Sequence, residues 1–94
     1  MRVRNMFGSS GRRSPNQFII TEDDGRETFQ SYRTTIAREE RDGSITLDPK
    51  WDCSVTTRRY LAAFLNREGS GFKRETEQRI ADGTYTVADL NPDR

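Results

Sequence analysis

The segment WDCSVTTRRYLAAFL, residues 51–65, constrains the fold more than any other part of the chain. One face of an α-helix collects side chains spaced at i, i+3, i+4, i+7 and i+8, and those positions here are Thr57, Tyr60, Leu61, Phe64 and Leu65. Ser54 stands just before this run, where its hydroxyl can accept from free backbone N–H groups of the first turn. The segment therefore predicts an amphipathic helix that lies across a β-sheet and builds most of the core.

A second helix is predicted from about Phe72 to Asp82, after the glycine-containing break REGSG. Its inward line is Phe72, Thr76 and Ile80, and Gly83 suits the left-handed residue that follows the end of many helices. Residues 51–82 are therefore expected to form a two-helix layer.

Residues 17–48 are predicted to form the sheet. Asp24-Gly25 and Asp42-Gly43 are turn dipeptides between runs rich in β-branched and aromatic residues. The middle strand is read as continuous from RETFQSY through RTTIARE, and Pro49 ends the sheet because proline cannot donate to a strand ladder. The candidates for the buried face of this sheet are Phe18, Ile20, Phe29, Ile36, Ile45 and Leu47.

The expected fold class is α+β, a three-stranded antiparallel β-meander packed against a two-helix layer. The chain of 94 residues is long enough for one small domain, residues 17–94, in which residues 84–91 could add a short C-terminal strand or an extended clasp. Residues 1–16 contain GSSG and RRSP and are expected to be a basic flexible tail. Docking of Val3, Met6 and Phe7 on the domain is left open.

The residue inventory argues against an enzyme. The chain has no histidine, which excludes Ser-His and Cys-His nucleophilic mechanisms, and it has one cysteine, which excludes an internal disulfide. Neither a Cys/His cluster with zinc-ligand spacing nor a phosphate-binding glycine loop occurs in the sequence. We therefore expect no catalytic activity, no metal and no cofactor.

Charge is distributed unevenly behind a net value of +1. Residues 1–16 hold four arginines and no acid, whereas residues 17–48 hold eight acids against four arginines. The candidate contacts for nucleic acid or a protein partner are the cations Arg2, Arg4, Arg12, Arg13, Arg58, Arg59, Lys73 and Arg74. The candidate acidic partner surface is Glu22, Asp23, Asp24, Glu39 and Glu40.

Each charged set also has a plainer interpretation. Acids at turn tips are ordinarily solvated, which is favoured over a carboxylate pair or a magnesium site at Asp23-Asp24 and Glu39-Glu40. The helix pair allows a helix-turn-helix interpretation, but Glu75, Glu77 and Asp82 would be repelled by phosphates. A solvated second helix is therefore favoured over a recognition helix.

The sequence has no apolar run near the ~18 residues of a membrane span and no apolar segment of a secretory signal. The single cysteine fits a reducing compartment. These features predict a cytoplasmic protein without a membrane partner.

Four segments resemble a family of short uncharacterised tailed-phage proteins: FQSYRTTIA (29–37), ITLD (45–48), WDCSVTTRRYLAAFL (51–65) and KRETEQRIADGTYTVADLN (73–91). Members read as an FQSY strand, a YLD strand, a WDYS-x-TT-x-x-Y-x-x-x-FL helix and a Lys/Glu-rich helix that ends in G-x-Y-x-x-x-DLN. This chain departs from the pattern at Cys53, where an aromatic residue is usual, and at REGSGF, which is longer than the usual linker. The resemblance implies a phage or prophage gene expressed in the host cytoplasm.

Taken together, the sequence predicts a non-catalytic, phage-encoded protein that binds a host or phage protein. By analogy with other small phage proteins, an inhibitor of a host defence system of the anti-CRISPR kind is one such function. The alternative is a nucleic-acid-binding accessory or regulatory protein that uses the basic tail and the helix arginines. A homodimer is also left open.

Overall fold

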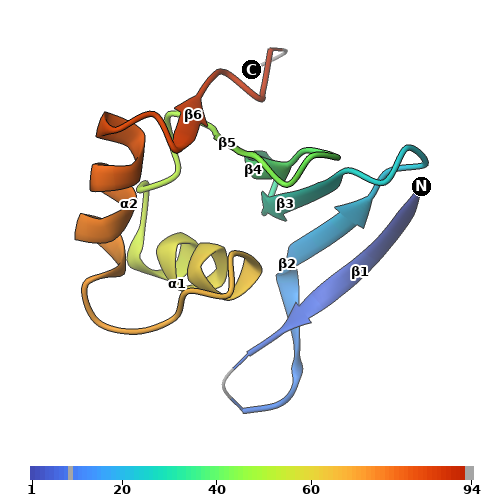
Figure 1. Cartoon of the computed structure of the whole chain (residues 1–94). Helices are drawn as coiled ribbons and strands as arrows, with labels where there is room; N and C mark the ends of the chain where they lie inside the picture. Colours follow the sequence, from blue (N-terminus) through green and yellow to red (C-terminus); the bar gives the residue numbers. More distant parts are fainter. Residues whose placement is uncertain (9, 93–94) are drawn as a thin grey trace.

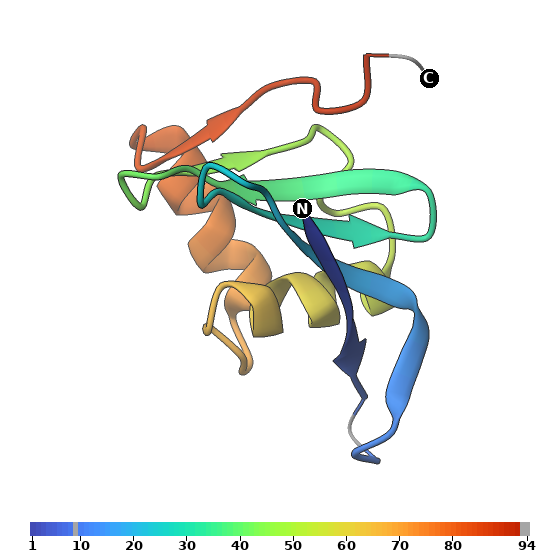
Figure 2. The same cartoon turned by 90° about the vertical axis from the view of Figure 1, so that its right-hand side faces the viewer.

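The computed structural model describes residues 1–8 and 10–92. Within these residues the chain forms one six-stranded sheet with two helices on one of its faces (Figures 1 and 2). The elements in chain order are β1 (Arg2–Phe7), β2 (Arg13–Thr21), β3 (Glu27–Ser31), β4 (Thr34–Glu39), β5 (Ile45–Leu47), α1 (Val55–Phe64), α2 (Phe72–Ala81) and β6 (Tyr85–Val87). The strands keep this order in the sheet, and every pairing is antiparallel except β5 with β6. The α+β class is confirmed, but the sheet is larger than predicted.

The N-terminal segment is not the flexible tail that its composition suggested. Residues 2–7 form β1, which pairs with β2 from Arg2 opposite Thr21 to Phe7 opposite Arg13. Met6 is 7% exposed and belongs to the core. The glycines of GSSG close a hairpin: Gly11 has a φ of 79°, and the Gly8 N–H donates to the Arg12 carbonyl at 2.8 Å. A composition typical of linkers here serves a turn between two strands.

The predicted long middle strand is two strands, β3 and β4, joined by a tight turn at Tyr32 and Arg33. Tyr32 has a φ of 57°, which a tyrosine adopts rarely, so its residue type did not indicate a turn. Two contacts stabilise the turn: the Tyr32 N–H donates to the Asn16 carbonyl at 2.7 Å, and Gln30 Nε2 donates to the Tyr32 carbonyl at 2.8 Å. The predicted three-stranded meander is thus the four consecutive strands β2–β5.

The two Asp-Gly turns are confirmed. Gly25 and Gly43 have φ values of 96° and 89°, in the region that favours glycine. The preceding aspartates accept from the chain two residues ahead, Asp24 from the Arg26 N–H at 3.1 Å and Asp42 from the Ser44 N–H at 2.9 Å. Strand β5 ends at Leu47, just before Asp48 and Pro49, as predicted.

Both predicted helices are confirmed. Ser54 caps α1, where its Oγ accepts from the Thr57 N–H at 3.0 Å. The helix ends with Asn66 in a left-handed conformation (φ 56°) and with a bond from the Arg67 N–H to the Ala62 carbonyl, which satisfies a carbonyl of the last turn. Helix α2 buries Phe72 and Thr76, and Gly83 (φ 83°) follows its end.

The core lies between the sheet and the helices. Its buried apolar residues are Met6, Phe29, Ile36, Ala37, Ile45, Leu47, Trp51, Leu61, Ala62, Phe72 and Tyr85. Phe64 packs against this cluster and stacks on Phe29 with ring centroids 5.9 Å apart. Four of the six predicted sheet positions are therefore correct.

The predicted inward face of β2 is wrong by one residue. Ile19 pairs with Phe29 and packs against the core, so Phe18 and Ile20 point to the opposite face of the sheet. The inward residue at the start of this run is Gln17, which is 2% exposed. A buried glutamine among apolar residues hid the true alternation of the strand.

The C-terminal segment provides both a strand and a clasp. β6 lies parallel to β5, and the chain then runs along the side of the sheet away from α1 (Figure 2). Asn91 bonds both backbone groups of Thr35, accepting from its N–H at 2.7 Å and donating to its carbonyl at 2.8 Å. Asp48 accepts from the Leu90 N–H at 2.9 Å and from Asn91 Nδ2 at 3.0 Å. The DLN sequence at residues 89–91 thus ties the C-terminal segment to the sheet.

Candidate functional site

A groove of about 360 Å³ lies between α1 and the start of α2. We call it the helix-side groove, and its lining residues are Val55, Arg58, Arg59, Ala62, Glu68, Gly69, Gly71, Phe72 and Lys73. The spacing of α1 explains this composition. Positions 55, 58, 59 and 62 repeat at i, i+3, i+4 and i+7, so they form a second stripe beside the one that covers the sheet. Three of the predicted cationic contacts are brought together here.

Asp52 links the two helices at this groove. Its carboxylate pairs with Arg58 from α1 and, at 3.2 Å, with Lys73 from α2. Partial burial raises the pKa of the Asp52 carboxyl, but the hydrogen bonds from Arg58 and Lys73 outweigh that effect and hold it below its usual value. Asp52 is therefore ionised at neutral pH and positions both cations at the groove.

A smaller hollow continues the helix-side groove toward the β1–β2 hairpin. It is lined by Phe7, Gly8, Arg59, Tyr60, Ala63 and Glu68, and it shares Arg59 and Glu68 with the groove. Gly8 lies so close to α1 that a Cβ there would be 3.2 Å from Tyr60 Oη. The hairpin is therefore part of the same surface as the helices.

The β1–β2 hairpin extends beyond the rest of the sheet (Figures 1 and 2). Strand β2 pairs with β3 from Gln17 onward, and the Asn16 carbonyl accepts from the Tyr32 N–H, so the part of β2 before Asn16 extends past β3. Arg12 and Arg13 lie in this overhang, next to Gly8. With Arg58, Arg59, Lys73 and Arg74 they form what we call the cationic end of the molecule.

The other two predicted cations lie elsewhere. Because β1 and β2 are antiparallel, Arg2 is opposite Thr21, at the far end of β2 from the hairpin turn. Arg4 donates to Thr21 Oγ1 at 3.3 Å and pairs with Glu27 at 3.5 Å. The eight predicted cations therefore divide between the cationic end and the edge of the sheet.

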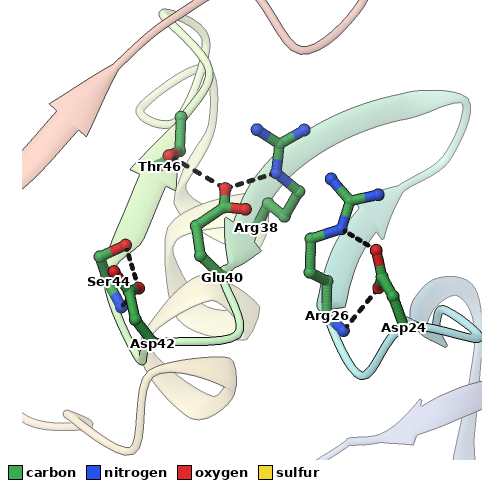
Figure 3. Close-up of polar contacts among 7 residues, drawn as sticks. All are labelled: Asp24, Arg26, Arg38, Glu40, Asp42, Ser44 and Thr46. Atoms are coloured by element: carbon green, nitrogen blue, oxygen red, sulfur yellow. Dashed lines mark hydrogen bonds and ion pairs between the residues drawn. The ribbon is translucent and has the colours of Figure 1, made fainter.

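The predicted acidic residues lie in two adjacent turns and at the end of β4 (Glu39), on the side of the sheet opposite the hairpin turn. Glu27 of β3 lies opposite Glu39 of β4 in the strand register, which brings the β2–β3 and β4–β5 turns side by side (Figure 3). The acids there are interleaved with arginines: Arg26 pairs with Asp24 at 2.9 Å, and Arg38 pairs with Glu40 at 2.6 Å. The acidic set is brought together, and three of its five carboxylates, those of Asp23, Asp24 and Glu40, have a cationic partner.

The carboxylates of Asp24 and Asp42 accept hydrogen bonds from nearby residues of the same turns. The backbone N–H of Arg26 lowers the pKa of Asp24, and the hydroxyl and N–H of Ser44 lower the pKa of Asp42. Glu40 also accepts from Thr46 Oγ1 at 3.3 Å. These contacts stabilise the turns, which favours a structural role for the acids over a partner surface.

Within residues 1–8 and 10–92, no group of three or more His, Cys, Asp or Glu side chains could hold a metal ion. No helix in that part of the chain is long and apolar enough to cross a membrane. Cys53 is exposed, and its Sγ lies 3.7 Å from Thr57 Oγ1.

Sequence reasoning missed the apolar members of the groove surface. Val55 and Phe7 are each 64% exposed, and Phe72 was assigned only to the core. Val55 carried a usable signal, because it is an apolar residue outside the inward stripe of α1. Phe7 carried none, since its place beside α1 depends on the hairpin.

Comparison with known proteins supplies one match. A model of a family of unknown function, DUF8033, matches residues 1–83. The curated proteins and the solved structures contain no match to the chain.

Proposed function

We propose that this member of DUF8033, the family of unknown function to which the chain belongs, is a non-catalytic protein that binds a partner protein in its helix-side groove. The observation that carries the proposal is the composition of the groove. The exposed side chain of Val55 lies above the core residues Ala62 and Phe72, and the cations Arg58, Arg59 and Lys73 line the same groove.

The apolar part of the groove supports a protein partner. Val55 is exposed on α1, and Ala62 and Phe72 line the groove beside it. Burying the exposed surface of Val55 yields roughly 25 cal/mol per Å² of apolar area, and a groove of this kind suits an apolar anchor residue. Nucleic-acid backbones offer no comparable apolar group.

The charged part of the groove indicates the chemistry of the partner. Arg58, Arg59 and Lys73 surround the apolar side chains, and Glu68 is the acid in the lining. Asp52 holds Arg58 and Lys73 in place, so their side-chain entropy is already reduced before a partner binds. The partner surface is therefore expected to be acidic around an apolar anchor.

The finer proposal is a phage-encoded inhibitor of a host defence system that acts in the host cytoplasm by occluding its target. The resemblance of WDCSVTTRRYLAAFL and KRETEQRIADGTYTVADLN to tailed-phage proteins supports it. A binding surface without a catalytic group fits inhibition by occlusion.

Nucleic-acid binding is the second candidate, and the β1–β2 hairpin favours it. Arg12 and Arg13 lie in the hairpin that extends past β3, beside the hollow that Arg59 lines. A ribbon with two arginines next to a basic helix surface can track a phosphate backbone. The net charge of +1 and the acids Glu75 and Glu77 on α2 weigh against it.

The experiment begins with capture of a partner by the tagged full chain, followed by purification of that partner and reconstitution. We expect a stoichiometric complex that Arg59→Glu and Val55→Asp each weaken by about tenfold or more, as the loss of a central contact does. Arg33→Glu is the matched control, because Arg33 is exposed in the β3–β4 turn and the charge change is the same. Equal affinity of Arg59→Glu, Val55→Asp and wild type for the partner would place binding elsewhere.

A gel-shift titration at two salt concentrations tests the second candidate. Phosphate contacts make log affinity fall with log salt by roughly one unit of slope per contact. Nucleic-acid binding predicts that Arg12→Ala combined with Arg13→Ala lowers the slope by about two units. Absence of any shift, together with a reconstituted protein complex, would exclude the nucleic-acid function.

A further inference from the structure

Strand β1 is an open edge of the sheet. Within residues 1–8 and 10–92, β1 occupies the first position in the strand order and pairs with β2 alone. An edge strand leaves about half of its backbone N–H and C=O groups unpaired by the sheet. The opposite edge is β6, which has three residues against six in β1. β1 is therefore the longer template for an added strand.

The side chains of β1 alternate in character. Arg2 and Arg4 lie on one face and are exposed, whereas Val3 lies on the other face and is 54% exposed. The register shows this alternation: Arg4 is opposite Ile19, which points toward the helices, and Val3 is opposite Ile20, which points away from them. A strand added beside β1 would meet cations on one of its faces and an apolar side chain on the other.

The neighbouring acids leave these cations accessible. Glu27 faces Arg4 at 3.5 Å, and both side chains are substantially exposed, so this ion pair contributes little to stability. Asp23 pairs with the Met1 amino group at the same end of the strand. A carboxylate arriving on a new strand can therefore replace Glu27 at Arg4 at small cost.

We propose that the edge of β1 binds an extended acidic segment of a partner protein as an additional strand of the sheet. Acidic residues at alternate positions of that segment pair with Arg2 and Arg4, and an apolar residue between them packs on Val3. Backbone hydrogen bonds provide the affinity of such strand addition, and side chains at alternate positions provide the specificity. This site is separate from the helix-side groove and does not depend on the function proposed for it.

A second copy of this chain fits the edge less well. Antiparallel self-pairing centred on Val3 places Arg2 opposite the Arg4 of the other copy, and pairing centred on Arg4 places Arg4 opposite itself. Like charges directly opposite each other destabilise a sheet. Pairing centred on Asn5 meets the irregularity between Asn5 and Phe7. The same arginines that attract an acidic strand thus oppose self-association.

The test uses the full chain and a labelled peptide of alternating valine and glutamate, about as long as the six residues of β1. Fluorescence anisotropy measures binding, and hydrogen–deuterium exchange locates it. Two control peptides carry lysine in place of glutamate, or a central proline that prevents strand pairing. We expect the glutamate peptide to bind and to slow exchange of the β1 amides. Each control peptide is expected to bind with an affinity at least about tenfold lower.

Charge reversal on the protein sharpens the test. Arg2→Glu combined with Arg4→Glu is expected to invert the preference, so that the lysine peptide binds more tightly than the glutamate peptide. Arg33→Glu combined with Arg41→Glu is the control, since it changes the net charge equally in exposed turns. Circular dichroism confirms that each variant is folded.

Three results would overturn the proposal. Equal binding of the glutamate and lysine peptides would remove the role of Arg2 and Arg4. Protection of α1 and α2 instead of β1, abolished by Arg59→Glu, would assign the peptide to the helix-side groove. Protection of β1 that appears without peptide and grows with protein concentration would identify a second copy as the occupant.

Discussion

Asp48 is a fully buried carboxylate that joins three parts of the chain. Its Oδ2 accepts from the Lys50 N–H at 3.0 Å, and its Oδ1 accepts from Leu90 and Asn91 of the C-terminal segment. Buried polar groups are tolerated when they are hydrogen-bonded, as here. The residue therefore couples the end of β5 to the clasp.

Asp48→Ala is expected to lower the free energy of unfolding by about 3 kcal/mol, because it leaves three partly buried donors without their acceptor. Urea unfolding measures the loss, and hydrogen exchange at Leu90 reports whether the clasp has opened. Asp42→Ala is the control, since Asp42 is exposed and its carboxylate bonds to the nearby Ser44. A loss no larger than that of the control would show that the clasp contributes little to stability.

Asp52 predicts a pH dependence. The pKa of its carboxyl is lower in the folded chain than its unfolded value of about 3.9, so the ionised form stabilises the fold. This contribution is complete above the unfolded pKa and is lost as the pH falls through the folded pKa. Wild type should therefore exceed Asp52→Asn in melting temperature at neutral pH, and the difference should shrink below about pH 4.

Thermal unfolding of both proteins from about pH 2 to 7 measures this difference, because that range extends to both sides of the unfolded carboxyl pKa of about 3.9. Asp24, Asp42 and Asp82 also have lowered pKa values, and they titrate in both proteins. The comparison therefore isolates Asp52. A difference in melting temperature between wild type and Asp52→Asn that stays constant over the whole pH range would contradict the stabilising role of the ionised Asp52 carboxylate.

Helix α1 has one face that packs against the sheet and another that lines the helix-side groove. Leu61 is completely buried against the sheet, whereas Val55 is exposed in the helix-side groove. Leu61→Ala is expected to cost about 3 kcal/mol of unfolding free energy, and Val55→Ala to change it by about 0.5 kcal/mol or less. Denaturant unfolding of the two variants checks this, and similar costs would mean that Val55 also supports the core.

The pairing of β1 with β2 predicts that deleting the N-terminal segment destabilises the fold, whereas its tail-like composition suggested that the deletion would be harmless. Deletion of residues 1–8 removes Met6 from the core and exposes β2 as a new edge. Met6→Ala alone is expected to cost about 2 kcal/mol, and the deletion more than that. Melting followed by circular dichroism measures both. A deletion variant that melts like wild type would restore the interpretation of this segment as a tail.

For the whole molecule, the decisive connection runs from β5 through α1 and α2 to β6. It places β6 parallel to β5, buries Tyr85 and allows Arg79 to lie 5.7 Å from the Tyr85 ring. The family match ends at residue 83, before this strand. A chain truncated after Gly83 loses β6 and the clasp together, and we expect it to lack a cooperative unfolding transition.

Circular dichroism melting and dye binding to exposed apolar surface test the truncated chain. The matched control ends after Pro92, which keeps β6 and the contacts of Asn91. If the chain that ends at Gly83 unfolded as cooperatively as this control, the β5–β6 connection would be dispensable for folding.

The sequence by itself determined the features that depend on local backbone preferences. The stripe of α1, its cap at Ser54, the break before α2, the Asp-Gly turns and the stop at Pro49 were all predicted correctly. Each depends on neighbouring residues whose conformational limits hold in any fold. The buried positions Ile45 and Leu47 followed from alternation along one strand, whereas Phe29 and Ile36 share a face because the turn at Tyr32 and Arg33 separates β3 from β4.

Only the tertiary structure decided the features that depend on contacts between distant residues. Met6 becomes core, and Gly8 and Gly11 lie at the end of a hairpin, because β1 pairs with β2. Tyr32 adopts its left-handed conformation because neighbouring strands hold it, and Gln17 is inward because β3 sets the register of β2. The helix-side groove and the cationic end exist because α1, α2 and the hairpin meet in space. Their residues are separated in the sequence, so no local preference could bring Arg12, Arg59 and Lys73 to one surface.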